Sequence, residues 1–167
     1  LENTQLTDEV TMTATGVSGV TDGGASISSQ VDEVFTVEQC LYAIMVASAN
    51  DIALQVAEHV GGSVDAFVQI MNTRAQELGC TNTVFTNPTG LPDENQHITA
   101  HDMALIMEAA MANDTFRTIA ATTSYTLPAT NVSGGERVLT NNFTMINSAS
   151  DGYYEPCIGG KEGYTEA

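Results

Sequence analysis

A run of capped helices that begins at Thr36 is the feature that most constrains how this chain can fold. Thr36 and Gln39 have the spacing of a capping box, and apolar residues then recur at helical spacing through residue 47. The pattern predicts a helix over 37–47. Similar signals predict four more helices between residues 52 and 121. Their expected N-terminal signals are Asp51 (52–60), Ser63 (64–78), Thr99 with Asp102, and the stretch "ANDTF" for a short last helix.

Strand patterns are concentrated after the helices. The stretches "SYTLPAT" and "RVLTNNFT" alternate in polarity on either side of Gly134-Gly135, which predicts two strands joined by a turn. The final stretch, "CIGGKEGYTEA", is predicted as a further strand whose glycines let another backbone approach. Residues 1–35 are predicted to be irregular, with at most a short hairpin. The fold class is therefore mixed α/β, mainly helical over 1–122 and stranded over 123–167.

The composition limits the kinds of partner. The 167 residues include 21 acidic and four basic side chains, which gives a formal net charge of −17. Binding to nucleic acid or to an anionic membrane surface needs clusters of lysine and arginine, so the charge argues against both partners. An apolar content of 43% is ordinary for one globular domain or a piece of one. No apolar run reaches the roughly 20 residues that span a bilayer.

Neither the cysteines nor the histidines form a metal-binding pattern. Cys40, Cys80 and Cys157 are far apart in the sequence and odd in number, so each is interpreted as a small apolar residue, and a disulfide between two of them is left open. His97 and His101 flank a predicted helix start and are assigned a structural role. Neither these residues nor any other motif of the sequence implies a metal or an organic cofactor.

Two short motifs have the chemistry of a reactive site. Ser48 and Asn50 lie at a break between two predicted helices, and Lys161, the only lysine of the chain, lies two residues before Gly163. A hydroxyl and an amide facing a lysine across a cleft suit acyl transfer, in which a nucleophile is activated and an oxyanion is held by donors. Each motif also has an ordinary explanation: a helix cap for Ser48 and Asn50, and a surface lysine beside a turn for Lys161.

The chain resembles the D-alanyl-D-alanine carboxypeptidases, which are low-molecular-weight penicillin-binding serine peptidases. The resemblance rests on "SAN", "FTNPTGL", "HITAHD" and the ending "GGKEGYTEA", which occur in the order of the family's motifs. It implies the penicillin-binding, β-lactamase-like transpeptidase fold, here as a helical subdomain plus part of an antiparallel sheet. It also implies a serine acyl-transfer mechanism built on S-x-x-K, S-x-N and K-T-G motifs.

The resemblance assigns roles to residues of both motifs. Ser48 would relay protons and Asn50 would contact the bound peptide. Lys161 would join the proton network and counter the terminal carboxylate of the substrate. Glu162 and Gly163 would line the substrate, and the glycine would leave room for the substrate backbone. The implied partners are peptidoglycan stem peptides ending in D-Ala-D-Ala and, in the intact protein, β-lactams. The implied location is outside the cytoplasmic membrane, in an exported and membrane-associated protein.

Two departures from the family pattern carry predictions. Ile158 stands three residues before the only lysine, so the chain contains no S-x-x-K. We therefore expect a fragment that begins just after the nucleophile motif, is not acylated by penicillin on its own, and exposes an apolar groove through which it could self-associate.

The second departure is Glu162, which replaces the family's usual Thr or Ser. An ionised Glu162 aimed at a substrate carboxylate would repel it by about 4 kcal/mol at 4 Å and an effective dielectric constant near 20. Three alternatives stay open: the side chain turns away, it pairs with Lys161, or the substrate preference has shifted.

Two rival functions are consistent with the same motifs. A β-lactamase would need a deacylating glutamate after the S-x-N helices, and the loop there contains only Glu94, without the expected flanking residues. A non-catalytic cell-wall-binding or scaffold protein would keep the fold and lack the nucleophilic serine.

Overall fold

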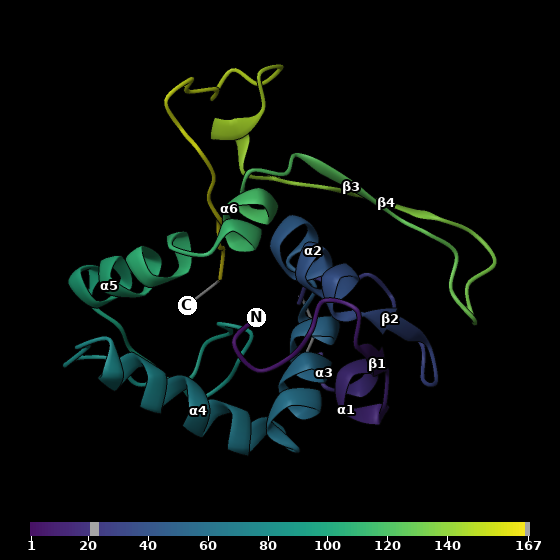
Figure 1. The fold of residues 1–167 in the computed structure, drawn as a ribbon, viewed down its shortest axis with the longest axis horizontal. Coiled ribbons are helices and arrows are strands. Elements are labelled where there is room, and N and C mark those ends of the chain that lie inside the picture. The colour runs from purple at the N-terminus through teal and green to yellow at the C-terminus, as the bar shows by residue number, and fades with distance from the viewer. Residues whose placement is uncertain (21–23, 166–167) are drawn as a thin grey trace.

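The computed structural model describes residues 1–20 and 24–165. Five helices, α2 to α6, are arranged as a ring, and the first residues of the chain lie near its centre (Figure 1). A hairpin extends from α6 along one side of α2. The helices are α1 (Ala14–Ser18), α2 (Val37–Ala47), α3 (Asn50–Gly61), α4 (Val64–Glu77), α5 (Ala100–Met111) and α6 (Asp114–Ala120), and a 3-10 turn spans Thr144–Ile146. The strands are β1 (Glu9–Thr11), β2 (Val34–Thr36), β3 (Ser124–Leu127) and β4 (Arg137–Thr140).

Most of the predicted helix starts are confirmed. The Thr36 side chain accepts a hydrogen bond from the Gln39 N–H, and the Gln39 side chain accepts one from the Thr36 N–H, which completes the capping box of α2. Ser63 caps α4 through the Ala66 N–H, and Thr99 caps α5 through the Asp102 N–H. These contacts satisfy N–H groups that have no partner within a helix, so local sequence is enough to position the starts.

The cap assigned to Asp51 is wrong. Helix α3 begins at Asn50, its N-cap is Ala49, and no side chain caps it. Asp51 lies inside the first turn, 1% exposed, and accepts hydrogen bonds from the 26–29 loop instead. A carboxylate is stabilised in the first turn of a helix whether or not it caps, so the residue type alone could not distinguish the two arrangements.

Residues 1–20 and 24–35 are more ordered than predicted. β1 pairs with β2 in antiparallel register, with Val10 opposite Phe35. Helix α1 was not predicted. It packs against α3 through Gly16, where an added Cβ would lie 2.8 Å from the Asp51 carbonyl oxygen. A five-residue helix is too short to form on propensity alone, so this tertiary contact explains why no local pattern revealed it.

The predicted C-terminal strand is not formed in the part of the chain that the structure describes. β3 and β4 form the expected antiparallel hairpin, with Tyr125 opposite Leu139. The segment 156–165, however, belongs to neither two-stranded sheet. A strand exists only where its backbone groups pair with a neighbour, and that condition cannot be read from the segment's own residues.

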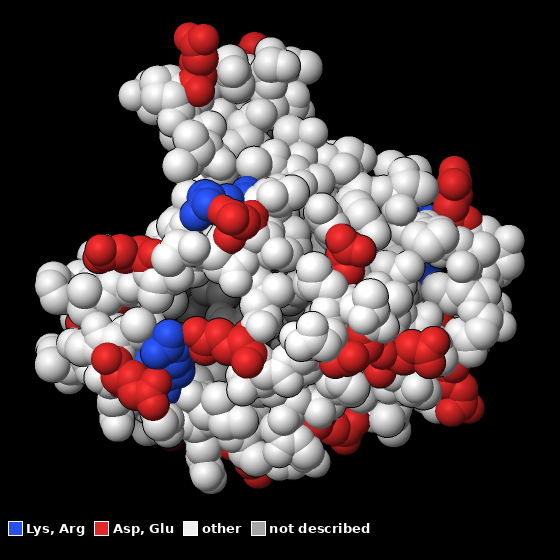
Figure 2. Space-filling view, viewed as in Figure 1, with Lys and Arg blue, Asp and Glu red and all other residues white. Residues whose placement is uncertain are grey.

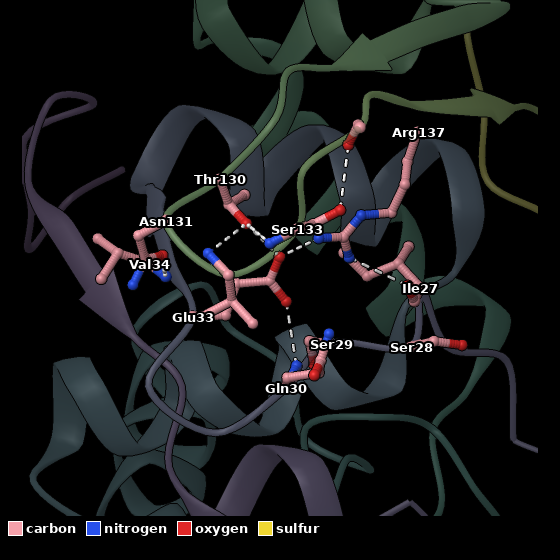
Figure 3. A network of polar contacts seen from close by, with 12 residues as sticks. Ile27, Ser28, Ser29, Gln30, Glu33, Val34, Thr130, Asn131, Ser133 and Arg137 are labelled. Atoms are coloured by element: carbon pink, nitrogen blue, oxygen red, sulfur yellow. Dashed lines mark hydrogen bonds and ion pairs between the residues drawn. The ribbon is translucent and has the colours of Figure 1, made fainter.

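A buried ion pair joins the hairpin to the rest of the molecule (Figure 3). Glu33 is completely buried and pairs with Arg137 of β4. Its carboxylate also accepts hydrogen bonds from the Thr130 hydroxyl at 2.6 Å and from the Gln30 N–H at 3.0 Å. The Arg137 guanidinium donates to the Ile27 carbonyl oxygen at 3.1 Å. The charge of Glu33 is thus compensated, and residues 27–33 are fixed against the hairpin.

The core lies between α2, the β1–β2 sheet and the β3–β4 hairpin, with Phe35, Met12, Ile52 and Leu127 among its fully buried side chains. Cys40 and Cys80 are buried and Cys157 is half-buried, and all three are free. Burial raises the pKa of the Cys40 thiol to about 12. Within the described residues, none of the helices is both long and apolar enough to span a membrane.

Inside the ring of helices lies an apolar groove of about 430 Å³. Side chains from five helices line it, including Leu41 of α2, Val56 of α3, Phe67 of α4 and Ile106 of α5. The first four residues of the chain also reach its wall. Self-association through this groove stays a prediction.

Candidate active site

A cleft of about 580 Å³ brings together the residues singled out from the sequence. One wall comes from the junction of α2 and α3, a second from the C-terminal segment, and a third from the loop that follows α4. Ser48, Asn50, Lys161, Glu162 and Gly163 all contribute to this cleft. Two motifs separated by more than a hundred residues of sequence therefore meet at one place.

The helix junction presents Ser48 and Asn50 on a sharply bent backbone. Ser48 ends α2 in the left-handed conformation, with φ of 54° and ψ of 33°. The Ala49 N–H returns to the Ala43 carbonyl oxygen at 3.2 Å, which closes α2. Asn50, 9% exposed, starts α3 and donates its N–H to the Ala25 carbonyl oxygen at 2.8 Å. Both residues are thus held by backbone contacts at the junction.

Asp51 fixes the loop behind this wall. Its carboxylate accepts hydrogen bonds from the hydroxyls of Ser26 and Ser29, both at 2.7 Å, and from the Ser29 N–H at 3.1 Å. The loop leads back to Gly24 and Ala25, which line the cleft. This role of Asp51 could not be predicted from the sequence, because its donors precede it by more than twenty residues. The only sequence signal for this network was the serine-rich stretch at residues 26–29, which offers hydroxyl donors for a buried carboxylate such as that of Asp51.

The opposite wall is held by two glycines. The Gly160 N–H donates to the Ala120 carbonyl oxygen at the end of α6, at 3.2 Å. A Cβ on Gly160 would overlap the ring of Phe143, and Gly159 has a φ of 150° beside Ala120. Only glycine fits both positions, and the close approach places the next residue, Lys161, in the cleft.

Lys161 supplies the positive charge of the cleft. In the described part of the chain each of the three arginines is paired with an acid: Arg74 with Glu2 and Glu77, Arg117 with Asp114, and Arg137 with Glu33. No ion pair there involves Lys161. Figure 2 shows acidic side chains spread over the face in view, with the few basic ones lying beside them. Lys161 is therefore the cation left available for an anionic ligand.

Desolvation within the cleft lowers the pKa of the Lys161 amine, and the nearby charge of Glu162 partly offsets this effect. The amine donates a hydrogen bond to the backbone carbonyl of Glu162 and not to its carboxylate. Pairing between the two side chains, one of the three alternatives for Glu162, is thus not observed. Because 161–165 is not a strand, Lys161 and Glu162 can both line the cleft, contrary to the alternation expected of a strand.

Gly163 faces open space. A Cβ built on this residue would meet no atom within 4 Å, and its φ lies outside the left-handed region. Neither packing within the chain nor backbone conformation requires glycine here. The open space beside Gly163 is part of the cleft, so a bound molecule has room to lie against the backbone there.

The third wall is a preorganised loop. The Asn87 side chain accepts hydrogen bonds from the N–H groups of Thr89 and Gly90, at 3.1 and 2.8 Å. Gln96 accepts from the N–H groups of Thr86 and Asn87 across the loop. Asn87 is thus a turn former. His97 contributes a backbone bridge to Val84, in agreement with its predicted structural role.

A profile of the D-alanyl-D-alanine carboxypeptidases matches residues 2–167. The chain belongs to this family. The carboxypeptidase DacB2 of Mycobacterium tuberculosis is 36% identical over 165 residues, which are 96% of this chain and 54% of DacB2. DacF of Bacillus subtilis is 44% identical over 84 residues, which are 50% of this chain and 22% of DacF. The chain thus spans about half the length of DacB2.

Solved structures of the family share the fold. A penicillin-binding protein homologue from Mycobacterium tuberculosis superposes with a TM-score of 0.86 and 32% identity, covering 99% of this chain and 59% of that one. The Streptomyces K15 DD-transpeptidase superposes with a TM-score of 0.89 and 28% identity, covering 99% of this chain and 65% of that one. The predicted fold class is confirmed. Among residues 1–20 and 24–165, no three His, Cys, Asp or Glu side chains group as metal ligands would.

Proposed function

We propose that this chain forms the S-x-N and K-x-G side of the active site of a serine-type D-Ala-D-Ala carboxypeptidase that acts on peptidoglycan stem peptides. The observation that supports the proposal is the cleft shared by Ser48, Asn50, Lys161 and Gly163. In a family member, these residue types in one cleft match the requirements of acyl transfer: a proton relay, an amide that aligns the peptide, and a cation for its carboxylate.

Each residue has a role that follows from its position. Lys161 attracts the terminal carboxylate of the peptide and thereby orients the scissile bond. Its lowered pKa eases proton exchange with the Ser48 hydroxyl, which would relay protons between the nucleophile and the leaving D-alanine. Asn50 aligns the peptide through its amide, and the open space at Gly163 lets the peptide backbone lie along residues 161–165.

The nucleophile itself is not among these residues. The chain has no S-x-x-K, so the acylated serine would come from a segment other than residues 1–167. We propose that a helix bearing that motif occupies the apolar groove inside the ring, whose walls come from five helices. This arrangement would make the chain inactive by itself.

The remaining expectations follow from the same proposal. Peptidoglycan substrates would place the protein outside the cytoplasmic membrane and in association with it, and β-lactams would acylate the protein once it has the nucleophile. Glu94 lines a neighbouring cavity and not the catalytic cleft, so the β-lactamase alternative gains no support.

The test is release of D-alanine from a peptide ending in D-Ala-D-Ala by the protein expressed from the complete gene. Ser48→Ala and Lys161→Ala should each lower kcat/KM by about a hundredfold or more. Ser28→Ala is a matched control, because Ser28 is exposed, lies outside the cleft and also has a positive φ, 57° against 54°. A fluorescent penicillin should covalently label the complete protein and should not label residues 1–167 alone.

A complete protein that binds the peptide but releases no D-alanine would contradict the proposal and favour the non-catalytic cell-wall-binding alternative. Equal losses in Ser28→Ala and Ser48→Ala would contradict the role given to Ser48.

A further inference from the structure

The catalytic cleft has two charged residues of opposite sign next to each other. Lys161 and Glu162 follow one another in the chain and both line the cleft, whereas the other described residues that line it carry no charge. The cleft therefore has a cation for an anionic ligand but no net positive charge. The proposed function uses the charge of Lys161 and gives Glu162 no task.

Contacts within the chain do not account for the Glu162 carboxylate. Glu162 is exposed, and no ion pair within residues 1–20 and 24–165 involves it. The Lys161 amine donates to the backbone carbonyl of Glu162, which places the amine beside that residue. Desolvation lowers the pKa of the Lys161 amine and the charge of Glu162 opposes this shift, so the two charges act on each other. A group bound by Lys161 therefore also lies beside the Glu162 carboxylate.

Lys161 and Glu162 offer a ligand opposite kinds of hydrogen bond. An ammonium group only donates, and an ionised carboxylate only accepts. A substrate that ends in a carboxylate also only accepts, so it suits Lys161 but is opposed by Glu162 in both charge and hydrogen bonding. A threonine or serine at position 162 would donate its hydroxyl to the second carboxylate oxygen, which Glu162 cannot do.

A primary carboxamide has the pattern that complements both side chains. Its oxygen accepts and its nitrogen donates, and one of its N–H groups lies on the same side as the oxygen, as the two oxygens of a carboxylate do. The oxygen can accept from Lys161 while this N–H donates to Glu162, in a hydrogen bond strengthened by the charge of the acceptor. A neutral carboxamide also costs less to desolvate than a carboxylate.

We propose that Glu162 is a specificity-determining residue through which the cleft selects peptides ending in D-Ala-D-alaninamide over peptides ending in D-Ala-D-Ala. The inference rests on the proposed function, since that function places the end of the peptide at Lys161. The bond that breaks is the same in both peptides. The amide between the last two residues is cleaved, its nitrogen takes a proton and leaves as D-alaninamide, and water supplies the oxygen of the new terminal carboxyl group.

The experiment uses three acetylated tripeptides that differ only in how the last D-alanine ends: a carboxylate, a primary carboxamide or an N-methylamide. In the N-methylamide, a methyl group takes the place of the N–H beside the oxygen. Pairs of peptides compete in one reaction with the protein expressed from the complete gene. The ratio of released products, measured by mass spectrometry, gives the ratio of their kcat/KM values, and this ratio does not depend on how much of a variant is folded.

Glu162→Thr and its control, Glu155→Thr, each remove one negative charge from the same segment. Glu155 is exposed and does not line the cleft. The peptides have different leaving groups and so differ in intrinsic reactivity, but this difference is common to all the proteins. The preference for carboxamide over carboxylate should be about tenfold lower in Glu162→Thr than in the unaltered protein, and unchanged in Glu155→Thr. The preference for carboxamide over N-methylamide should also fall only in Glu162→Thr.

The same carboxamide-to-carboxylate ratio in all three proteins would overturn the inference. An equal fall in both variants would overturn it too, because the preference would then come from net charge. Cleavage of the N-methylamide as efficiently as the primary carboxamide by the unaltered protein would rule out the hydrogen bond to Glu162. Failure of the proposed function has a different signature, which is that none of the three peptides is cleaved. Affinities of the same proteins for the three peptides, measured by titration calorimetry, then decide on Glu162.

Discussion

The two principal walls of the cleft are built in different ways. The Ser48–Asn50 wall is the junction of two helices, and behind it the buried Asp51 carboxylate binds the hydroxyls of Ser26 and Ser29. The Lys161 wall is an extended segment without a strand partner in the described residues, held to α6 by one backbone hydrogen bond from Gly160 and by its packing on Phe143. The first wall is fixed by a network within the chain and the second by close contacts at Gly159 and Gly160.

This difference means that the two walls should respond to substitution in different ways. Removing a member of the network should destabilise the whole domain, because several buried donors lose their acceptor at once. Disturbing the glycine contact should displace the lysine and leave most of the fold intact. The three predictions that follow test this contrast.

The largest effect is expected at Asp51. Asp51→Ala leaves the Ser29 hydroxyl and N–H without their acceptor in a buried position, so the free energy of unfolding should fall by about 2–4 kcal/mol. Urea unfolding measures this change. Hydrogen exchange should also show faster exchange at the Asn50 N–H, whose acceptor, Ala25, belongs to the loop that Asp51 holds.

Asp151→Ala is the matched control for Asp51→Ala. Asp151 is exposed, and its removal should change the unfolding free energy by less than about 0.5 kcal/mol. A similar loss in both variants would show that the network around Asp51 does not distinguish the two walls.

A smaller effect is expected at the glycines of the other wall. Gly160→Ala forces a methyl group against Phe143, which should cost about 1–3 kcal/mol or move the segment away from α6. Gly163→Ala meets no atom of the chain, so it should leave stability unchanged while it blocks the approach of a peptide.

Unfolding curves and kcat/KM for D-alanine release, measured on both glycine variants, separate the two outcomes. Full activity in Gly163→Ala would contradict a peptide lying against that backbone. Unchanged stability together with unchanged activity in Gly160→Ala would show that the Phe143 contact does not position Lys161.

The smallest effect is expected at Glu162. Its carboxylate is exposed and shares the cleft with Lys161, so solvent screening reduces its repulsion of a substrate carboxylate well below the value for a buried pair. Glu162→Thr should raise kcat/KM on a D-Ala-D-Ala peptide by up to about tenfold, mainly through a lower KM. Glu155→Thr, an exposed glutamate of the same segment that does not line the cleft, is the control, and an equal rise in both would point to net charge alone.

The sequence predicted those parts of the molecule whose causes are local. Thr36, Ser63 and Thr99 cap helices within three residues of themselves, and the strands on either side of Gly134-Gly135 pair with each other, so short patterns were sufficient. The resemblance to the carboxypeptidases predicted that Ser48 and Lys161 share one site. Neither motif predicted this on its own.

The predictions that were wrong concern features that depend on residues distant in the sequence. Asp51 was mistaken for a cap because its partners are the distant Ser26 and Ser29. Helix α1 depends on the contact of Gly16 with α3, and a strand over 156–165 depends on a neighbour to pair with. The cavity that Glu94 lines was also missed, since it is formed where α4, α5, the 86–96 loop and Thr165 meet.

The left-handed backbone of Ser48 has a consequence for how the protein can change. A non-glycine residue in this conformation costs about 1–2 kcal/mol, so glycine would suit the fold better at this position. Glycine would also remove the hydroxyl that the proposed mechanism needs. Stability and chemistry therefore favour different residues at position 48, and a serine kept there would mark a trade-off in which the enzyme gives up stability to retain its proton relay.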